Sequence, residues 1–150
     1  MGILVVDDDD DVREAFQALL SSGGYTDVIP LESAESAFSF LALDAPLVPV
    51  APLNLILLDI VMPNVDGYQT CARIRRDHRY ANVPIVMTTS LDDDESVDRA
   101  FKVGATDYLT NPMKAVDLLA CVRSMLILNA ELDRRNALER ELAQHVQFQF

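Results

Sequence analysis

The sequence predicts an α/β fold in which a parallel, doubly wound sheet is covered by helices on both faces. Short apolar runs alternate along the chain with segments in which apolar residues recur at helical spacing. Such regular alternation is typical of parallel sheets joined by right-handed crossovers. The apolar runs are also nearly continuous, as expected for strands that are buried on both faces.

Composition limits the range of functions. The chain has 150 residues, of which 50% are hydrophobic, and this suits one domain with a real core. The net charge of −12 opposes binding to nucleic acid and to anionic membranes, so we expect neither as a partner. No apolar run approaches about 18 residues and no leader is evident, so a cytoplasmic location is expected. Cys71 and Cys121 are expected to be reduced thiols.

Five strands are expected from apolar runs rich in β-forming residues. They cover residues 3–6, 27–31, 53–59, 83–90 and 106–110. The second contains Pro30, which cannot donate to a β-ladder, so that strand should lie at a sheet edge. The third, LNLILLD, is the most strongly apolar and should be central.

Helices are expected between these strands, with recognisable signals at their ends. Asp9 or Asp10 can cap the first helix, which ends at Gly23-Gly24, and Ser33 can cap the second. The helices cover about residues 12–22, 32–43, 65–77 and 92–104, and a last one starts after Asn111-Pro112. Between them, residues 44–52 carry three prolines and form an apolar loop. We favour packing of this loop on its own domain, with a partner-contact patch as the alternative.

The last helix is expected to overshoot the domain. From Met113 to about Val146 there is no proline or glycine to end it. Beyond Asn129 the segment is polar, although Leu132, Leu138, Leu142 and Val146 keep a broken apolar stripe, and Glu131 and Arg135 can pair. We therefore divide the chain into a domain over 1–127 and a helical extension over 128–150. The extension is either a solvated tail or a coiled-coil linker to an output domain or a second copy.

Polar side chains gather where the predicted strands end. In parallel α/β sheets, sites form at the carboxyl ends of the strands. Asp7 and Asp8 follow the first strand, and Asp59 ends the third. The fourth strand ends in Thr88, Thr89 and Ser90, and the fifth runs through Tyr108 to Asn111.

Three converging carboxylates repel one another unless a cation joins them. Mg²⁺ prefers such oxygen ligands, so we expect a magnesium site at this edge. Asp59 stands alone at the end of the central strand and is the candidate nucleophile toward phosphorus, giving an aspartyl phosphate. Thr89 can donate a hydrogen bond to the incoming phosphoryl group. The remaining residues of the acidic run, Asp9–Asp11, are better explained by helix capping.

Four segments together resemble the receiver domain of two-component response regulators. They are ILVVDDDDDVRE, LILLDIVMPNVDGYQ, PIVMTTS and GATDYLTNP, in the family's order and spacing, within about residues 3–127. The resemblance implies a flavodoxin-like, five-stranded parallel sheet in the order 2-1-3-4-5, flanked by five helices. It also implies a phosphoprotein that receives its phosphoryl group from a sensor histidine kinase or a phosphotransfer protein.

The resemblance implies specific roles for the strand-end residues. Asp59 matches the phosphoacceptor. The metal would be held by Asp8, Asp59 and the main-chain carbonyl of Val61, with Asp7 acting largely through water. Thr89 matches the switch hydroxyl and Tyr108 the aromatic that changes rotamer. The expected phosphate-contact and switch residues are thus Thr89, Ser90, Tyr108 and Asn111.

One position departs from the family pattern. Asn111 stands where the family has a lysine whose ammonium pairs with the phosphate or the phosphoacceptor. An amide donates a hydrogen bond but carries no charge. Two hypotheses follow: a Mg²⁺-dependent phosphoacceptor module, or a phosphorylation-independent receiver used for interaction or dimerisation.

Enzymes on similar folds fit the sequence less well. A phosphatase with an aspartyl nucleophile would want a second aspartate two residues after Asp59, where Val61 stands. A flavin-binding protein would want a Ser/Thr/Gly-rich loop after the first strand, where aspartates stand. We therefore expect no enzyme within these residues beyond a domain that supports its own phosphotransfer.

Overall fold

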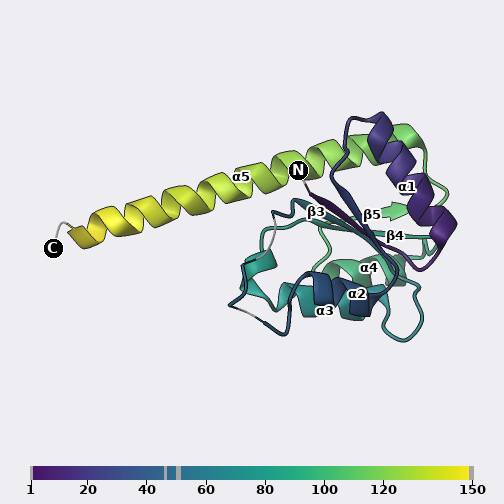
Figure 1. Ribbon diagram of the computed structural model, residues 1–150, viewed down its shortest axis with the longest axis horizontal. Helices are drawn as coiled ribbons and strands as arrows, with labels where there is room; N and C mark the ends of the chain where they lie inside the picture. Colours follow the sequence, from purple (N-terminus) through teal and green to yellow (C-terminus); the bar gives the residue numbers. More distant parts are fainter. Residues whose placement is uncertain (1, 46, 50–51, 149–150) are drawn as a thin grey trace.

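The computed structural model describes residues 2–45, 47–49 and 52–148, and its centre is one five-stranded sheet (Figure 1). All strand pairs are parallel, in the order β2-β1-β3-β4-β5, which confirms the predicted fold. The strands are β1 (Ile3–Val6), β2 (Val28–Leu31), β3 (Leu55–Asp59), β4 (Ile85–Thr89) and β5 (Asp107–Thr110). Pro30 lies in β2 at the sheet edge, as predicted.

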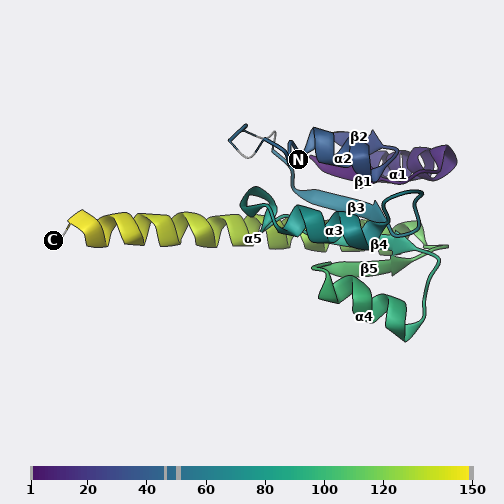
Figure 2. The same cartoon turned by 90° about the horizontal axis from the view of Figure 1, so that it is seen from below.

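Helices cover both faces of the sheet. They are α1 (Asp10–Ser22), α2 (Ala34–Phe40), α3 (Gly67–Arg75), α4 (Asp94–Lys102) and α5 (Ala115–Phe148), with a 3₁₀ turn η1 (His78–Tyr80). Figures 1 and 2 show α1 and α5 on one face and α2, α3 and α4 on the other. Each face therefore has its own apolar layer, and the three central strands β1, β3 and β4 between them are almost fully buried, whereas the edge strands β2 and β5 are partly exposed.

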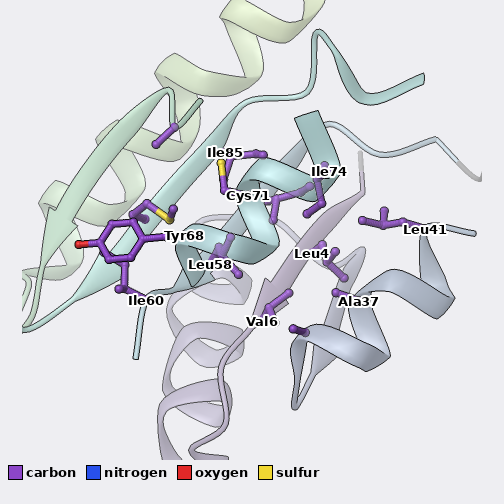
Figure 3. Close-up of a cluster of buried hydrophobic side chains, with 14 of the residues drawn as sticks. Leu4, Val6, Ala37, Leu41, Leu58, Ile60, Tyr68, Cys71, Ile74 and Ile85 are labelled. Atoms are coloured by element: carbon purple, nitrogen blue, oxygen red, sulfur yellow. The ribbon is translucent and has the colours of Figure 1, made fainter. Parts of the chain in front are cut away.

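The larger apolar layer lies under α2, α3 and α4 (Figure 3). Alternate residues of the central strands point into it, because side chains along a strand alternate between the two faces. Leu4, Val6 and Leu58 fill this layer, whereas Ile3, Val5 and Leu57 fill the layer under α1 and α5. The two cysteines are free thiols, as predicted.

The helix ends follow the predicted signals, with two differences. Asp9 caps α1 by accepting from the amide of Asp11 at 2.9 Å, and Ser33 caps α2. The second helix ends at Phe40 rather than near residue 43, because the chain turns at Ala42, where φ is +52°. The turn η1 was not predicted; Asp77 caps it by accepting from the amide of Arg79.

The loop after α2 is fastened to the domain by one arginine. The guanidinium of Arg79 donates to the carbonyls of Ala42 and Val48, each at 2.7 Å, and pairs with Asp77 at 2.6 Å. The described part of the loop is therefore held by its own domain, whereas residues 46, 50 and 51 of the predicted loop lie outside the described residues. Leu47 nevertheless points into solvent.

Helix α5 is the longest element and leaves the domain as a single helix (Figure 2). Leu118, Val122 and Leu126 anchor its first half in the core. Among the side chains described up to residue 145, the last buried one of α5 is Asn129, which accepts from the side-chain amide of Asn54 at 2.9 Å and donates to the carbonyl of Asn82 at 3.0 Å. Among the described residues, no helix combines the length and apolarity needed to cross a membrane.

Glu131 on α5 has a closer partner than the predicted Arg135. It forms an ion pair with Arg134, at 2.7 Å between Oε1 and Nη2, and this hydrogen bond together with the charges of Arg134 and Arg135 lowers the pKa of Glu131. Both the i,i+3 and the i,i+4 spacings place two side chains on the same side of a helix, so the sequence left either arginine within reach.

Candidate functional site

The predicted acidic cluster forms at the carboxyl ends of β1 and β3. Ligand oxygens of Asp7, Asp8 and Asp59 all lie within 4.8 Å of one another. The register explains this proximity, because Val6 pairs with Leu58 and the next residue on each strand is an aspartate. Asp7 is buried, Asp59 is half-buried and Asp8 is exposed, so the cluster opens to solvent on one side.

Burial and mutual repulsion raise the free energy of this cluster when all three carboxylates are ionised. Burial, followed by the neighbouring charge of Asp7, raises the pKa of Asp59 from 3.8 to about 7. Burial also raises the pKa of Asp7, although the amide of Asp9 opposes this by donating to its Oδ1 at 2.9 Å. A divalent cation between the carboxylates would relieve both effects.

The donor set fits a hard divalent cation. Three carboxylates with one open side are suited to Mg²⁺, which binds through a few carboxylates and keeps several waters. The Val61 side chain is exposed, and the amide of Val61 donates to Asp59 Oδ1 at 3.3 Å. This hydrogen bond places the segment after β3 against the cluster, where the resemblance expects the Val61 carbonyl to contribute.

The turn from β3 into α3 is packed tightly behind Asp59. Gly67 begins α3, and a Cβ atom there would lie 2.3 Å from the Asp59 carbonyl oxygen. Asp66 caps the helix in a reciprocal capping box with Gln69. Asn64 turns the chain with a φ of +70°. The phosphoacceptor candidate is therefore held by a backbone that tolerates no side chain at residue 67.

The two predicted switch residues meet at one residue of the loop after β4. The amide of Leu91 donates to Thr89 Oγ1 at 3.3 Å, and the carbonyl of Leu91 accepts from the hydroxyl of Tyr108. Burial raises the pKa of Tyr108 to about 12, so the hydroxyl keeps its proton and acts as the donor. Thr89 and Tyr108 are thus both hydrogen-bonded to the backbone of Leu91.

Ser90 and Asn111 lie at the ends of β4 and β5. Ser90 is exposed, and Asn111 is half-buried beside a cis bond to Pro112. The amide of Asn111 donates to the carbonyl of Thr89 at 2.7 Å, which ties the two strand ends together. Within the described part of the chain, the Asn111 side chain makes no hydrogen bond.

A basic residue that we did not predict borders the cluster. Arg13 of α1 donates to the carbonyl of Asp7 at 2.5 Å and pairs with Asp10. It also favours the charged form of Asp7 and so opposes the rise in its pKa. The spacing of Asp10 and Arg13, three residues apart on a helix, was the available signal, but that spacing alone did not point to Asp7.

Comparison with known proteins agrees with this geometry. Residues 3–123 match the family model of the response regulator receiver domain. The chain belongs to this family. The receiver domain thus spans most of the sequence, and the acidic cluster lies within it.

Individual relatives of this receiver domain are known in sequence and in structure. The DNA-binding dual master transcriptional regulator RpaA of Synechocystis is 36% identical over 83% of this chain and 48% of that protein. The structure of a putative response regulator from Chloroflexus aurantiacus has a TM-score of 0.74 and 30% identity, covering 84% of this chain and 97% of that one. A BeF₃-activated DrrB receiver domain has a TM-score of 0.69 and 29% identity, over 83% and 96% of the two chains.

The curated relatives are longer than this chain. The chain spans about half the length of the curated relatives it matches, such as RpaA. The similarity therefore covers their receiver part.

Proposed function

We propose that this receiver domain is a Mg²⁺-dependent phosphoacceptor whose phosphorylated residue is Asp59. The observation that carries the proposal is the convergence of three carboxylates within 4.8 Å at the open edge of the sheet. A sensor histidine kinase or a phosphotransfer protein is the donor that the family implies. The magnesium ion would be held by Asp8, Asp59 and the Val61 carbonyl, with Asp7 acting through water, and would neutralise charge on the phosphoryl oxygens.

The transfer itself needs a nucleophile and a leaving group. One carboxylate oxygen of Asp59 forms a bond to phosphorus as the phosphorus–nitrogen bond of the donor phosphohistidine breaks, and the imidazole leaves. Asp59 must be ionised for this step. A cation that lowers its pKa from about 7 therefore favours the reaction at neutral pH.

The response to phosphorylation is proposed to pass through the loop after β4. If the Thr89 hydroxyl turns to donate to a phosphoryl oxygen, its contact with the Leu91 amide is lost. Leu91 also holds the Tyr108 hydroxyl, so the tyrosine would be released together with the loop. The surface formed by α4, β5 and α5 would change accordingly.

Asn111 supports the second candidate, a receiver that acts without phosphorylation. Its neutral amide cannot supply the positive charge that the family's lysine brings to the phosphoryl group. With only Arg13 as a basic neighbour of Asp7 in the described chain, the cluster depends strongly on the metal ion for neutralisation.

Phosphorylation by acetyl phosphate distinguishes the two candidates. With Mg²⁺, we expect intact-protein mass spectrometry to show addition of one phosphoryl group to the wild type and none to Asp59→Asn. Asp11→Asn is the matched control, because Asp11 belongs to the same acidic run but is exposed on α1. A wild-type chain that is not modified, and that shows no Mg²⁺-dependent response to beryllofluoride, would favour the phosphorylation-independent receiver.

The role of Asn111 is tested by comparing the wild type with Asn111→Lys. If the missing charge limits the reaction, the lysine variant should be phosphorylated faster and its phosphoryl group should be lost at a different rate. Lys114→Gln is the control, because it changes a nearby exposed lysine just before α5. Equal rates in the wild type and Asn111→Lys would show that residue 111 does not limit phosphorylation.

The output is proposed from the lengths and names of the relatives. Because RpaA is a DNA-binding transcriptional regulator and this chain matches about half of it, we propose that the receiver controls an output segment or a second copy through residues 128–150. A cytoplasmic location is consistent with such relatives.

A further inference from the structure

The large exposed apolar side chains of α5 up to residue 145 lie on one face of the helix. Among the described residues, four large apolar side chains of α5 are exposed. They are Val116 (74%), Ile127 (65%), Leu138 (47%) and Leu142 (64%). At 100° per residue, these four fall within an arc of about 80°, which we call the outer face of α5.

The outer face points away from the domain. Leu118, Val122 and Leu126 pack on the sheet and define the opposite side of the helix. The centre of the outer face lies about 160° from the centre of this buried side. A partner on this side of the helix does not displace the contacts of α5 with the sheet, and Figure 2 shows that the C-terminal part of α5 extends beyond the domain.

The apolar residues of the outer face follow a nearly straight line along the helix. Val116, Ile127 and Leu138 are each 11 residues apart, which is three helical turns, and Leu142 follows one turn later. A second α-helix can follow such a stripe without marked supercoiling. The irregular heptad register of the extension is therefore no obstacle to pairing.

The part of α5 beyond Asn129 has little to stabilise it as a single chain. About 19 residues continue past the last buried side chain. Most helical stability in proteins comes from packing of an apolar face rather than from intrinsic propensity, and the described side chains of this segment are mostly exposed rather than packed on another element. Within the described chain, the ion pair between Glu131 and Arg134 supports this segment, but both side chains are exposed and such pairs contribute little.

We propose that the outer face of α5 is a self-association surface at which a second copy of this chain pairs in parallel. In a parallel two-fold pair, each of Val116, Ile127, Leu138 and Leu142 meets its own counterpart, so every apolar position is matched. An antiparallel pair cannot match all four at once.

Charge favours a second copy as the occupant. Residues 128–150 hold four acidic and three basic residues, so nearly all of the net charge of −12 lies on residues 1–127. The extension is therefore the part of the chain that a second, equally acidic copy can approach. Glu131 and Arg134 lie in the outer face and can exchange partners across the two-fold axis.

The proposal is tested by sedimentation equilibrium of the full chain without phosphoryl donor. We expect a dimer in the wild type, and a dissociation constant at least about a hundredfold higher in Leu138→Gln/Leu142→Gln, since four leucines leave the interface. Ala137→Gln/Ala143→Gln is the matched control, because both alanines are exposed on other sides of the same helix. A monomeric wild type, or equal weakening by both double variants, would overturn the proposal. Circular dichroism confirms that each variant is folded.

Orientation is tested by disulfide trapping. Under mild oxidation, Leu138→Cys should give a covalent dimer in high yield, whereas Ala137→Cys should not. Low yield for Leu138→Cys in a chain that is dimeric by sedimentation would refute the parallel arrangement. Because neither experiment involves Asp59, the result is independent of whether the domain is phosphorylated.

Discussion

Replacing Asp59 by asparagine should stabilise the metal-free domain at high pH and leave it unchanged at low pH. The pKa of Asp59 is raised from 3.8 to about 7 in the folded protein. Between these two values the folded state holds a proton that the unfolded state has lost. Stability therefore falls as pH rises through this interval and stays low above it. The asparagine side chain carries no charge, so the stability of the variant does not fall in this way as pH rises.

The size of the effect follows from the pKa shift. About three pH units at 1.36 kcal/mol each give an upper value of about 4 kcal/mol. Asp59 is only half-buried and open to solvent on one side, so screening reduces the expected difference to about 2 kcal/mol. This is a large fraction of the stability of an ordinary domain.

Urea unfolding in EDTA at about pH 5 and about pH 8 measures this difference. We expect the gain in unfolding free energy of Asp59→Asn over the wild type to be larger at the higher pH. Added Mg²⁺ should remove most of the wild-type deficit. Asp11→Asn, on the exposed side of α1, should show no such dependence. If Asp59→Asn gains the same unfolding free energy at both pH values, the reasoning that repulsion and burial raise the pKa of Asp59 is refuted.

Three further changes test other parts of the structure. Gly67→Ala should lower the free energy of unfolding by about 2 kcal/mol in urea titrations, because the new methyl would lie 2.3 Å from the Asp59 carbonyl oxygen. Asn129→Leu should cost about 1–3 kcal/mol by the same measurement, since the carbonyl of Asn82 loses its donor. Arg79→Lys should speed amide hydrogen exchange in residues 41–49 and not elsewhere, because an ammonium cannot reach both loop carbonyls that the guanidinium holds at 2.7 Å.

Much of the fold could be predicted because its signals are local. Pro30 placed its strand at the edge, since a missing amide hydrogen excludes a central position. Asp9 and Ser33 marked helix starts through bonds that span only a few residues. The acidic cluster was also predictable, because the ends of the strands could be predicted and parallel strands place their carboxyl-terminal residues at one edge of the sheet.

Contacts between distant residues could not be predicted in the same way. Arg79 holds a loop more than 30 residues before it, and Asn129 joins segments 47 and 75 residues away. A lone arginine or asparagine in a polar stretch is most often solvated, so neither residue stood out. The choice between Arg134 and Arg135 as the partner of Glu131 depended on side-chain conformation, which spacing does not determine.

The missing lysine and the raised pKa of Asp59 have a joint consequence. A lysine at residue 111 would bring a positive charge to the strand ends and would share the neutralisation of the carboxylates with a metal ion. Asn111 cannot, so ionisation of Asp59 near neutral pH should depend almost entirely on the cation. The dependence of phosphorylation on Mg²⁺ concentration should accordingly be steeper in this domain than in its Asn111→Lys variant. Identical Mg²⁺ dependence in the two proteins would mean that residue 111 lies electrostatically apart from the acidic cluster.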